Sequence, residues 1–462
     1  MIKEDSHSIS EKQCCNDKGK TDDGGNKASL PVQSVEEFKE MMYKMQGARR
    51  LIVGALLRNA PIKNEWEEVL HSTYMTLIDS CTQGFQCRVH TSHSELLLNI
   101  RDEITGLAKD LKFLELLHEG FHKLPKSSTA EVLSCIDLSL MLEPYHPVST
   151  TAFHDEQCAT VNFLREFVAL NTDGKKPIFV TDWDGTMKDY CSQYITNLQP
   201  IYSAVGMTRF LERFTRLSAV LTAGPLSGIG ILHLTAMPIN GPVLFSGSWG
   251  REWYLNGKRV VHTDGISDEG FSALEMMEKE VDSLLRTDDY SVFEMVGSGV
   301  QRKVDRLTLG VQTVCGHVPP ELSRRYQEEI KKRVHRVDPE NHILVFNPST
   351  SLEVEVVAHN SGTVWNKADG VDRVIIEMND SLEGPGKVLI CGDTRSDLPM
   401  VKRAAARNPD GVMAIFVGLN EELRDEVRDI VGDDCRCCFV SCPDVIHASM
   451  ALLLNEDIHG TM

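Results

Sequence analysis

The sequence predicts an α/β protein: an open, mostly parallel sheet with crossover helices, interrupted by an inserted α/β domain and preceded by a bundle of helices. Amphipathic helical repeats before residue 150 predict the bundle. Short apolar strands that alternate with helices after residue 160 predict the sheet. A long segment between the second and third of these strands has a strand and helix pattern of its own, which predicts the insertion. The chain has 462 residues, which is too long for one core and suggests roughly three units.

Composition and charge argue against several classes of function. Lys and Arg total 48 against 67 Asp and Glu, and the net charge of −19 disfavours generic binding to nucleic acid or to an anionic membrane. The Met1 end has no apolar leader, and the most apolar stretch, residues 219–245, is broken by glycines and prolines, so we expect neither a signal peptide nor a membrane span. Residues 1–32 are polar and charged and predict a disordered tail. The thirteen cysteines favour reduced thiols in a cytoplasmic protein.

The segment of residues 33–150 carries three helical patterns. Ser34 and Glu37 form a capping-box pattern ahead of a long amphipathic helix, and Ser92 with Glu95 begins another in the same rhythm. A further apolar pattern between them predicts a third helix. We therefore expect a helical bundle, whose apolar stripes serve either internal packing or self-association and partner binding.

The remaining chain divides into a sheet domain and its insertion. The candidate strands of the parallel sheet are Ile178 to Thr181, Ala219 to Thr222, Val388 to Cys391, Ala414 to Val417 and Cys438 to Val440. We expect the sheet domain to comprise residues 170–257 and 358–462, and the inserted domain residues 258–357. The dipeptide Asn256-Gly257 predicts a tight hairpin, because both residues accept the positive φ that such a turn requires.

The last predicted strand lies in a cysteine-rich segment that has an alternative interpretation. Cys435, Cys437, Cys438 and Cys442 are close together and could hold zinc. No second pair and no nearby histidine completes the usual spacing, so a buried strand is favoured.

Polar residues follow three of the predicted strands, at the points where the strands end. Asp182 and Asp184 follow the first strand, Thr222 to Gly224 the second, and Asp393 and Asp397 the strand that ends at Cys391. Ligands of open α/β sheets bind at the carboxyl ends of the strands, so these side chains are expected to converge. A carboxylate can accept a phosphoryl group when Mg²⁺ and a cationic side chain offset the negative charge, and all of these parts are present.

The set of motifs resembles that of haloacid dehalogenase superfamily phosphatases. The matching segments, in the family's order, are Asp182-x-Asp184-Gly185-Thr186, Leu221-Thr222-Ala223-Gly224, Lys367 and Gly392-Asp393-x3-Asp397. The resemblance covers roughly residues 176–450 and implies a Rossmann-like haloacid dehalogenase core with an inserted cap domain. We expect this domain to act as a lid, because a reactive acyl phosphate and a small sugar phosphate both benefit from the exclusion of bulk water.

The resemblance also implies a role for each catalytic residue. Asp182 would be the nucleophile that attacks phosphorus. Asp184 would protonate the leaving sugar oxygen and later deprotonate water. Thr222 and Gly224 would hold phosphate oxygens, and Lys367 would neutralise charge.

The implied cofactor is Mg²⁺. Its ligands would be Asp182, Asp393 and the backbone carbonyl of Asp184, while Asp397 would either ligate the ion or brace the site.

In detail the chain is similar to trehalose-6-phosphate phosphatases, and its helical segment resembles that of the nematode enzymes. The similarity is carried by Ser246-Gly247-Ser248-Trp249-Gly250-Arg251-Glu252, Gln301-Arg302-Lys303 and Leu352-Glu353-Val354-Glu355. It implies sugar contacts by Glu252, Lys303 and one of Glu353 or Glu355, with added basicity from Arg251 and Arg302. The family commonly has an acidic residue in place of Gln301, and the spacing from Glu355 to Lys367 is longer than in many members.

The expected reaction is therefore the Mg²⁺-dependent hydrolysis of trehalose 6-phosphate to trehalose and phosphate through an aspartyl phosphate. One alternative is a phosphatase for another sugar phosphate, such as sucrose phosphate or a hexose phosphate, because only the cap selects the sugar. A second alternative is a non-catalytic regulatory partner of trehalose-phosphate synthase. The sequence disfavours the latter, because Asp182, Asp184, Lys367 and Asp393 are all present.

Overall fold

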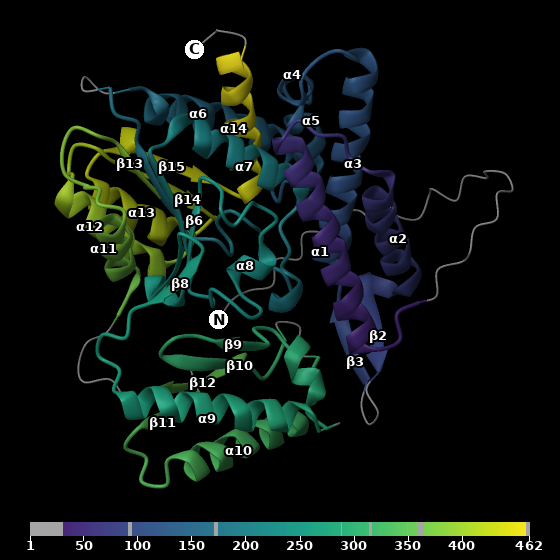
Figure 1. Cartoon of the computed structure of the whole chain (residues 1–462), viewed down its shortest axis with the longest axis vertical. Coiled ribbons are helices and arrows are strands. Elements are labelled where there is room, and N and C mark those ends of the chain that lie inside the picture. Colours follow the sequence, from purple (N-terminus) through teal and green to yellow (C-terminus); the bar gives the residue numbers. More distant parts are fainter. Residues whose placement is uncertain are drawn as a thin grey trace, which may run out of the picture.

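A central sheet carries a helical module on one side and a smaller α/β domain below it in the view of Figure 1. The computed structural model describes residues 31–90, 95–170, 174–287, 289–313, 317–348, 350–358 and 365–458. The predicted disordered tail lies outside these residues except for its last two positions. Of these, Val32 is buried and its N–H donates to Ser80 Oγ at 2.9 Å.

The first part of the chain, which we call the N-terminal module, runs from α1 to α5. Its helices are α1 (Val35–Leu57), α2 (Asn64–Ser80), α3 (Arg101–Lys123), α4 (Thr129–Ser134) and α5 (Leu138–Leu142). An antiparallel sheet lies between α2 and α3 in the chain, in the order β1 (Cys81–Thr82), β2 (Gln86–His90), β3 (Glu95–Asn99). The apolar stripe of α1 is buried inside the molecule, with Phe38, Met45 and Ile52 fully covered, so internal packing accounts for it.

The prediction of a helix that begins at Ser92 is wrong. Ser92 lies outside the described residues, residues 95–99 form strand β3, and the helix begins at Arg101. Leu96 and Leu98 are buried and pair with Val89 and Cys87 of β2. Leu96 and Leu98 are two residues apart, which is the spacing of side chains on one face of a strand. The predicted helical spacing was correct only for the residues of α3 and was extended too far toward the N-terminus.

The central sheet has eight strands, which we call the core sheet. Its spatial order is β15 (Cys437–Val440), β14 (Val412–Val417), β13 (Val388–Gly392), β4 (Ile178–Thr181), β5 (Leu217–Leu221), β6 (Leu244–Gly247), β7 (Glu252–Leu255), β8 (Lys258–Val261). The strands from β15 to β6 are parallel, and β7 and β8 add an antiparallel hairpin at the edge. The parallel strands confirm the five predicted ones to within two residues, including the last strand in the cysteine-rich segment.

Helices cover both faces of the core sheet. One face packs against α6 (Thr150–Val168), α7 (Ile201–Phe214) and α14 (Pro443–Ile458), and the other against α11 (Lys367–Glu377), α12 (Leu398–Arg407) and α13 (Glu421–Val431). Side chains of a strand point alternately to the two faces, and in β4 Phe179 packs on the first face while Ile178 and Val180 pack on the second. A short helix, α8 (Ile231–Leu234), lies between β5 and β6 along the chain.

The inserted domain, which we call the cap, is built on a second sheet. Its antiparallel strands follow the order β11 (Leu344–Asn347), β12 (Glu353–Ala358), β10 (Arg306–Gly310), β9 (Val300–Arg302). Helices α9 (Asp268–Leu285) and α10 (Pro320–Val337) cover the face that points away from the core sheet (Figure 1). The predicted limit between residues 257 and 258 divides the β7–β8 hairpin, and since both strands belong to the core sheet, the structure moves this limit beyond Val261.

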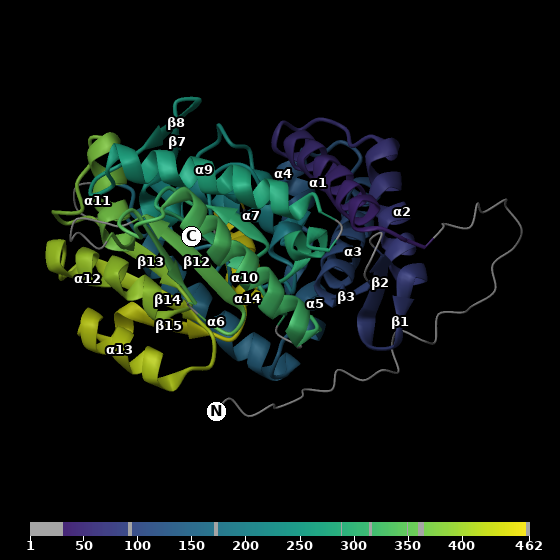
Figure 2. The same cartoon turned by 90° about the horizontal axis from the view of Figure 1, so that it is seen from below.

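One apolar cluster joins the three parts of the molecule. It contains Phe38 of the N-terminal module, Phe179 of the core sheet and Phe293 of the cap, all fully buried. Figure 2 shows the same closeness from below, with α1 and α3 alongside the sheet domain. Within the described residues, no helix combines the length and the apolar character needed to span a membrane.

Candidate active site

The carboxyl ends of β4, β5 and β13 meet at one edge of the core sheet. The N–H of Asp182 donates to the carbonyl of Cys391 at 3.0 Å, which continues the β4–β13 ladder one residue beyond β4. Asp182 is 6% exposed, so its side chain is buried at this edge. The sequence predicted this convergence, because neighbouring parallel strands end on the same side of a sheet.

Lys367 enters this edge from the start of α11. Asn366 and Asp369 form a capping box at that helix start, and the box fixes the direction in which the first helical residue leaves the chain. Lys367 is 1% exposed, and its Nζ lies 2.5 Å from Asp182 Oδ1 and 2.5 Å from Asp397 Oδ1. Two carboxylates raise the pKa of this ammonium group despite its burial, so it stays charged.

Asp397 braces the loop that follows β13. Its Oδ2 accepts the N–H groups of Asp393 at 3.1 Å and Thr394 at 3.0 Å, while its Oδ1 faces Lys367. Both oxygens therefore have donors already. Of the two roles left open by the sequence, this arrangement favours bracing over metal ligation.

Asp182, Asp393 and Asp397 form a cluster that fits a metal ion. One carboxylate oxygen from each residue lies within 4.8 Å of the others. Burial raises the pKa of Asp182 well above its ordinary value, with Lys367 opposing and the other two carboxylates adding to the rise. Burial and Asp397 also raise the pKa of Asp393, to about 7. The single lysine thus leaves negative charge uncompensated, and an all-oxygen donor set suits a hard cation.

Asp184 stands apart from this cluster. Its Oδ1 accepts a hydrogen bond from Asn197 Nδ2 at 2.6 Å. Burial raises the pKa of Asp184, although the bond from Asn197 acts in the opposite direction. The two aspartates of the motif therefore have different surroundings: Asp182 faces a lysine and Asp184 faces a neutral amide, which suits two different chemical roles.

The turn that directly follows Asp184 requires glycine at position 185. Its φ is +84°, in the left-handed region that glycine tolerates. A Cβ at this position would lie 2.2 Å from Asp393 Oδ2 and 2.4 Å from Tyr190 Cε2. Backbone conformation and space both exclude a side chain here, so the loop that we call the Asp182 loop (residues 182–189) closes tightly against Asp393.

Thr222 and Gly224 form the third side of the site. Thr222 is buried, and its Oγ1 accepts the N–H of Gly224 at 3.1 Å. A Cβ on Gly224 would come within 2.6 Å of the hydroxyl of Tyr194, so this close approach also depends on glycine. The segment can present a hydroxyl group and backbone N–H groups to an oxyanion.

The cap places Lys303 over this edge of the core sheet. Lys303 Nζ lies 4.6 Å from the ring of Trp249, and the guanidinium of Arg306 lies 4.5 Å from the same ring. Trp249 belongs to the short helix η4 (Ser248–Gly250) and has a φ of +56°, which is rare for a bulky residue. Burial lowers the pKa of Lys303 to about 8, with Glu355 acting against this shift.

Glu353 and Glu355 lie on the side of β12 opposite to its helix-packed valines. Glu355 faces Thr308 across the strands, accepts its hydroxyl at 3.2 Å and pairs with Arg306 at 3.1 Å. Glu353 accepts the hydroxyl of Ser298 at 2.5 Å. The predicted residues Lys303, Glu353 and Glu355 are thus brought to one side of the cap.

Arg302 and Arg251, which the resemblance suggested as added basicity near the substrate, are bound within the protein. Arg302 pairs with Glu278 and Asp282 of α9, on the helix-covered side of the cap sheet. Arg251 is fully buried and donates to the carbonyl of Asp264 at 2.9 Å, in the segment that leads into the cap.

Glu252 is also occupied. Its Oε1 accepts the N–H of Leu226 and the hydroxyl of Ser248, each at 2.8 Å, and its Oε2 pairs with Arg259 at 2.6 Å. Ser248 Oγ in turn accepts the N–H of Val304 at 3.1 Å. Glu252 therefore shapes the turn beneath Trp249 and links it to the cap.

Family comparison agrees with this arrangement. The model of the C-terminal part of trehalose-6-phosphate phosphatase matches residues 179–446, and the model of its N-terminal helical bundle domain matches residues 34–132. The chain belongs to the trehalose-6-phosphate phosphatase family. It is a phosphatase, and the predicted resemblance and fold class are confirmed.

Three relatives bear the name trehalose-phosphatase. The protein of Brugia malayi is 60% identical over 430 residues, which is 93% of this chain and 87% of the relative. The protein of Caenorhabditis briggsae is 48% identical over 438 residues, covering 93% and 99%. The protein of Caenorhabditis elegans is 48% identical over 430 residues, covering 93% and 97%. The similarity to trehalose-6-phosphate phosphatases thus includes the N-terminal module.

Several site residues of this trehalose-6-phosphate phosphatase family member were not predicted from sequence. Asn197 contacts Asp184, and Tyr190 donates its hydroxyl to Asp393 Oδ2 at 2.9 Å. Thr186 Oγ1 lies 3.4 Å from Asp182 Oδ2 and 3.3 Å from Asp393 Oδ1. Thr186 and Tyr190 lie within or directly after the aspartate motif and could have been considered, whereas nothing local marks Asn197.

Proposed function

We propose that the chain hydrolyses trehalose 6-phosphate to trehalose and phosphate. The observation that carries this proposal is the pairing of two unlike aspartates at one sheet edge, Asp182 against Lys367 and Asp184 against Asn197. The names of the relatives give the substrate, and the polar side of the cap is compatible with sugar hydroxyls.

In this proposal Asp182 is the nucleophile. A carboxylate oxygen of Asp182 attacks phosphorus, and the bond between phosphorus and the sugar oxygen breaks. Asp184 gives its proton to that oxygen, so trehalose leaves as a neutral alcohol. Asp184 then takes a proton from water, which attacks the aspartyl phosphate, releases phosphate and restores Asp182. Lys367 holds the nucleophile in place and offsets the charge that builds up beside it.

We further propose that the site holds Mg²⁺. Carboxylate oxygens of Asp182 and Asp393 and the backbone carbonyl of Asp184 would bind it, with Asp397 bracing the loop. The clustered oxygens and the raised pKa values of Asp182 and Asp393 support this assignment. When bound, the ion would offset negative charge on the nucleophile and the phosphate.

The proposed substrate contacts divide between the core and the cap. Thr222 and Gly224 would hold phosphate oxygens, while Lys303 and one of Glu353 or Glu355 would contact sugar hydroxyls. Arg302 and Glu252 already have partners within the protein, and Arg251 donates through Nη1 to the carbonyl of Asp264, so we assign these three residues to structure instead.

We propose that the cap acts as a lid that excludes bulk water from the acyl phosphate. In the structure, hydrogen bonds near the site join the cap to the core. The N–H of Tyr194 donates to the carbonyl of Gly297 at 3.0 Å, and Val304 donates to Ser248.

The test is a phosphate-release assay with Mg²⁺ and a panel of trehalose 6-phosphate, sucrose phosphate and hexose phosphates. We expect the highest kcat/KM for trehalose 6-phosphate and no turnover by Asp182→Asn. A higher kcat/KM for another sugar phosphate would replace the substrate but retain the chemistry. Undiminished phosphate release by Asp182→Asn would refute the proposed nucleophile.

A further inference from the structure

A turn that leads away from the Asp182 loop is held by the N-terminal module. This turn, which we call the Thr196 turn, comprises residues 191–197 and includes the short helix η3 (Tyr194–Thr196). At the start of α3, Glu103 accepts the hydroxyl of Thr196 at 2.7 Å and the thiol of Cys191 at 3.4 Å, both at Oε1. Asp102 accepts the N–H of Ser192 at 3.2 Å. Glu103 is 4% exposed, so these contacts are sheltered from water.

The last residue of this turn is Asn197, which donates to Asp184. Asn197 is 2% exposed and is held from both sides along the chain. Before it, Thr196 is bound to Glu103 of α3. After it, the carbonyl of Leu198 accepts a hydrogen bond from Arg49 of α1 at 3.3 Å. Both anchors belong to the N-terminal module.

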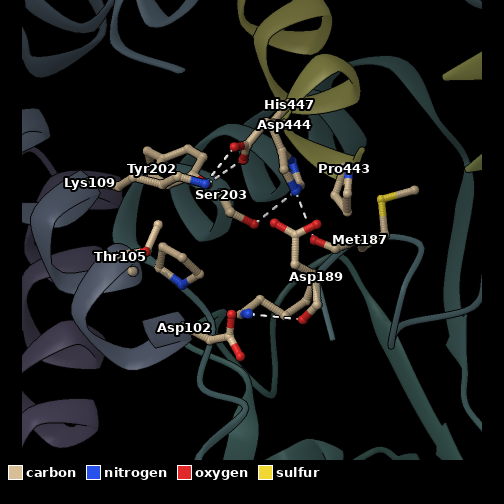
Figure 3. A pocket seen from close by; sticks show the side chains of 13 residues that line it. Asp102, Thr105, Lys109, Met187, Asp189, Tyr202, Ser203, Pro443, Asp444 and His447 are labelled. Carbon is tan, nitrogen blue, oxygen red and sulfur yellow. Dashed lines mark hydrogen bonds and ion pairs between the residues drawn. The ribbon is translucent and has the colours of Figure 1, made fainter. Parts of the chain in front are cut away.

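A second set of contacts fixes the Asp182 loop itself. A cavity of about 50 Å³ lies behind this loop, between α3, α7 and α14, and its polar side chains are shown in Figure 3. Lys109 of α3 pairs with Asp444 of α14 at 2.5 Å, and both are nearly fully buried. His447 of α14 lies with its Nε2 2.8 Å from the carbonyl of Met187. The loop is thus supported from the rear by a helix that α3 holds in place.

We propose that the N-terminal module positions the acid–base carboxyl group of Asp184, with Glu103 acting through Thr196 and Asn197. This inference rests on the role of Asp184 proposed above. Asn197 engages Oδ1 of Asp184, and in this proposal the other oxygen, Oδ2, carries the transferred proton. A carboxyl group that is already held in the productive orientation loses little conformational entropy when it donates its proton to the leaving oxygen. Such positioning can account for a large part of the reduction in the activation barrier. Glu103, Thr196 and Asn197 are positioning residues, because they act through Asp184.

Leaving-group chemistry separates this role from general structural support. The sugar of trehalose 6-phosphate leaves as an alcohol and needs a proton, whereas p-nitrophenol leaves readily as its anion. The value of kcat/KM reports only the steps up to release of the leaving group, so hydrolysis of the acyl phosphate does not affect the comparison. Loss of a positioned acid should therefore lower kcat/KM for the sugar phosphate much more than for p-nitrophenyl phosphate.

The decisive pair of variants is Thr196→Val and Thr196→Ser in the full chain. Thr196→Val keeps the side-chain shape but cannot donate to Glu103, while Thr196→Ser keeps the donor. We expect Thr196→Val and Asn197→Ala to lower kcat/KM for trehalose 6-phosphate about 10- to 100-fold, with less than about a threefold change for p-nitrophenyl phosphate. Thr196→Ser should retain wild-type values for both substrates.

Glu103→Gln tests the residue of the N-terminal module directly. We expect the same selective loss in smaller measure, because glutamine still accepts a hydrogen bond from Thr196 but offers one acceptor oxygen in place of two. The matched control is Glu115→Gln, which removes an exposed carboxylate from the same helix and should leave both substrates unaffected. Equal losses for both substrates in Thr196→Val and Asn197→Ala, or no loss for either substrate, would overturn the proposal.

A double-mutant cycle separates failure of this inference from failure of the proposed function. If Asn197 acts through Asp184, Asn197→Ala should cause no further loss of kcat/KM for the sugar phosphate in an Asp184→Asn background. A full additional loss would overturn the positioning role. Wild-type turnover of the sugar phosphate by Asp184→Asn would instead refute the proposed acid. If the substrate panel identifies another sugar phosphate, that compound replaces trehalose 6-phosphate in the same comparison.

Discussion

Lys367 Nζ lies 2.5 Å from Asp182 Oδ1, and both side chains are almost completely buried. The same ammonium group contacts Asp397, so one cation links the end of β4, the start of α11 and the loop after β13. Asp182 Oδ1 is thereby engaged, while among the described residues Oδ2 has the hydroxyl of Thr186 at 3.4 Å. The pair thus selects which oxygen of Asp182 is available for chemistry.

Replacement of Lys367 should affect both activity and stability. In Lys367→Met, two buried carboxylates lose their cation, and breaking such a pair typically costs about 3–5 kcal/mol in the free energy of unfolding. We expect kcat/KM to fall by more than about 100-fold. Urea unfolding and phosphate release measure the two effects. Lys332→Met, on the exposed side of α10, serves as the control. If Lys367→Met were as active as the wild-type chain, Lys367 would have no role in catalysis.

Gly185→Ala and Gly257→Ala should separate backbone strain from crowding. Both glycines have positive φ, +84° and +77°. A Cβ at Gly257 meets nothing within 4 Å, whereas at Gly185 it would meet Asp393 Oδ2 at 2.2 Å. We expect Gly257→Ala to lose about 1 kcal/mol of stability through strain and Gly185→Ala to lose more, because crowding adds to the strain. Only Gly185→Ala should lose most of its activity. Comparable activity in the two variants would mean that the close approach to Asp393 has no catalytic importance.

Removal of divalent metal should stop turnover reversibly. We expect a chelator to abolish phosphate release, Mg²⁺ to restore it, and Ca²⁺ to restore it poorly, because Ca²⁺ prefers longer bonds and more ligands. Mg²⁺ should also raise the melting temperature of the wild-type chain, since a ligand of the folded state stabilises it. In Asp393→Asn this rise should disappear. Full activity in the presence of the chelator would exclude the proposed metal dependence.

Glu103 should make stability depend on pH near neutrality. Burial raises the pKa of Glu103 to about 7 from 4.5, with Asp102 adding to the rise and the hydrogen bonds from Thr196 and Cys191 opposing it. Arg49 and Lys188 line the same small cavity. Because the folded-state pKa is the higher one, the stabilisation is fully present below pH 4.5 and is lost as pH rises through about 7.

Glu103→Gln isolates this contribution. The free energy of unfolding of the wild-type chain relative to Glu103→Gln should fall between pH 5 and pH 8 by a few kcal/mol. Chemical unfolding across this pH range measures the difference. A pH-independent difference would show that Glu103 does not change its protonation there.

Lys303 and Arg302 are neighbours in sequence with different predicted effects. Lys303 lies over Trp249 beside the site, whereas Arg302 is paired with α9. Lys303→Met should lower kcat/KM for trehalose 6-phosphate at least about tenfold and leave p-nitrophenyl phosphate nearly unaffected, because the aryl substrate has no sugar to bind. Arg302→Met should change neither value. If the two variants had the same kcat/KM for trehalose 6-phosphate, Lys303 would not be a sugar-binding residue.

The sequence was sufficient for the catalytic edge because that edge follows from local patterns. Apolar strands that end in Asp182, Thr222 and Asp393 must meet if the strands are parallel, and the structure brings them together. The helix predicted from Ser92 was wrong because a period-two stretch at Glu95–Asn99 also fits helical spacing.

Contacts between distant segments could not be predicted in this way. Arg302 and Lys303 look equivalent in sequence, and only the pairing of β9 with β10 decides which one faces the core. Asn197 reaches Asp184 because Glu103 and Arg49, nearly a hundred or more residues earlier in the chain, fix the intervening turn. Such relationships depend on tertiary packing, which no local pattern specifies.

The apolar cluster that contains Phe38, Phe179 and Phe293 bears on how this chain could have been assembled in evolution. A gene for the sheet domain alone would encode a protein with an uncovered apolar face, and a gene for the helices alone would encode a bundle without its support. Each half completes the interior of the other. A polar substitution of Phe38 in α1 is therefore expected to destabilise the same interior on which the sheet domain and the cap depend.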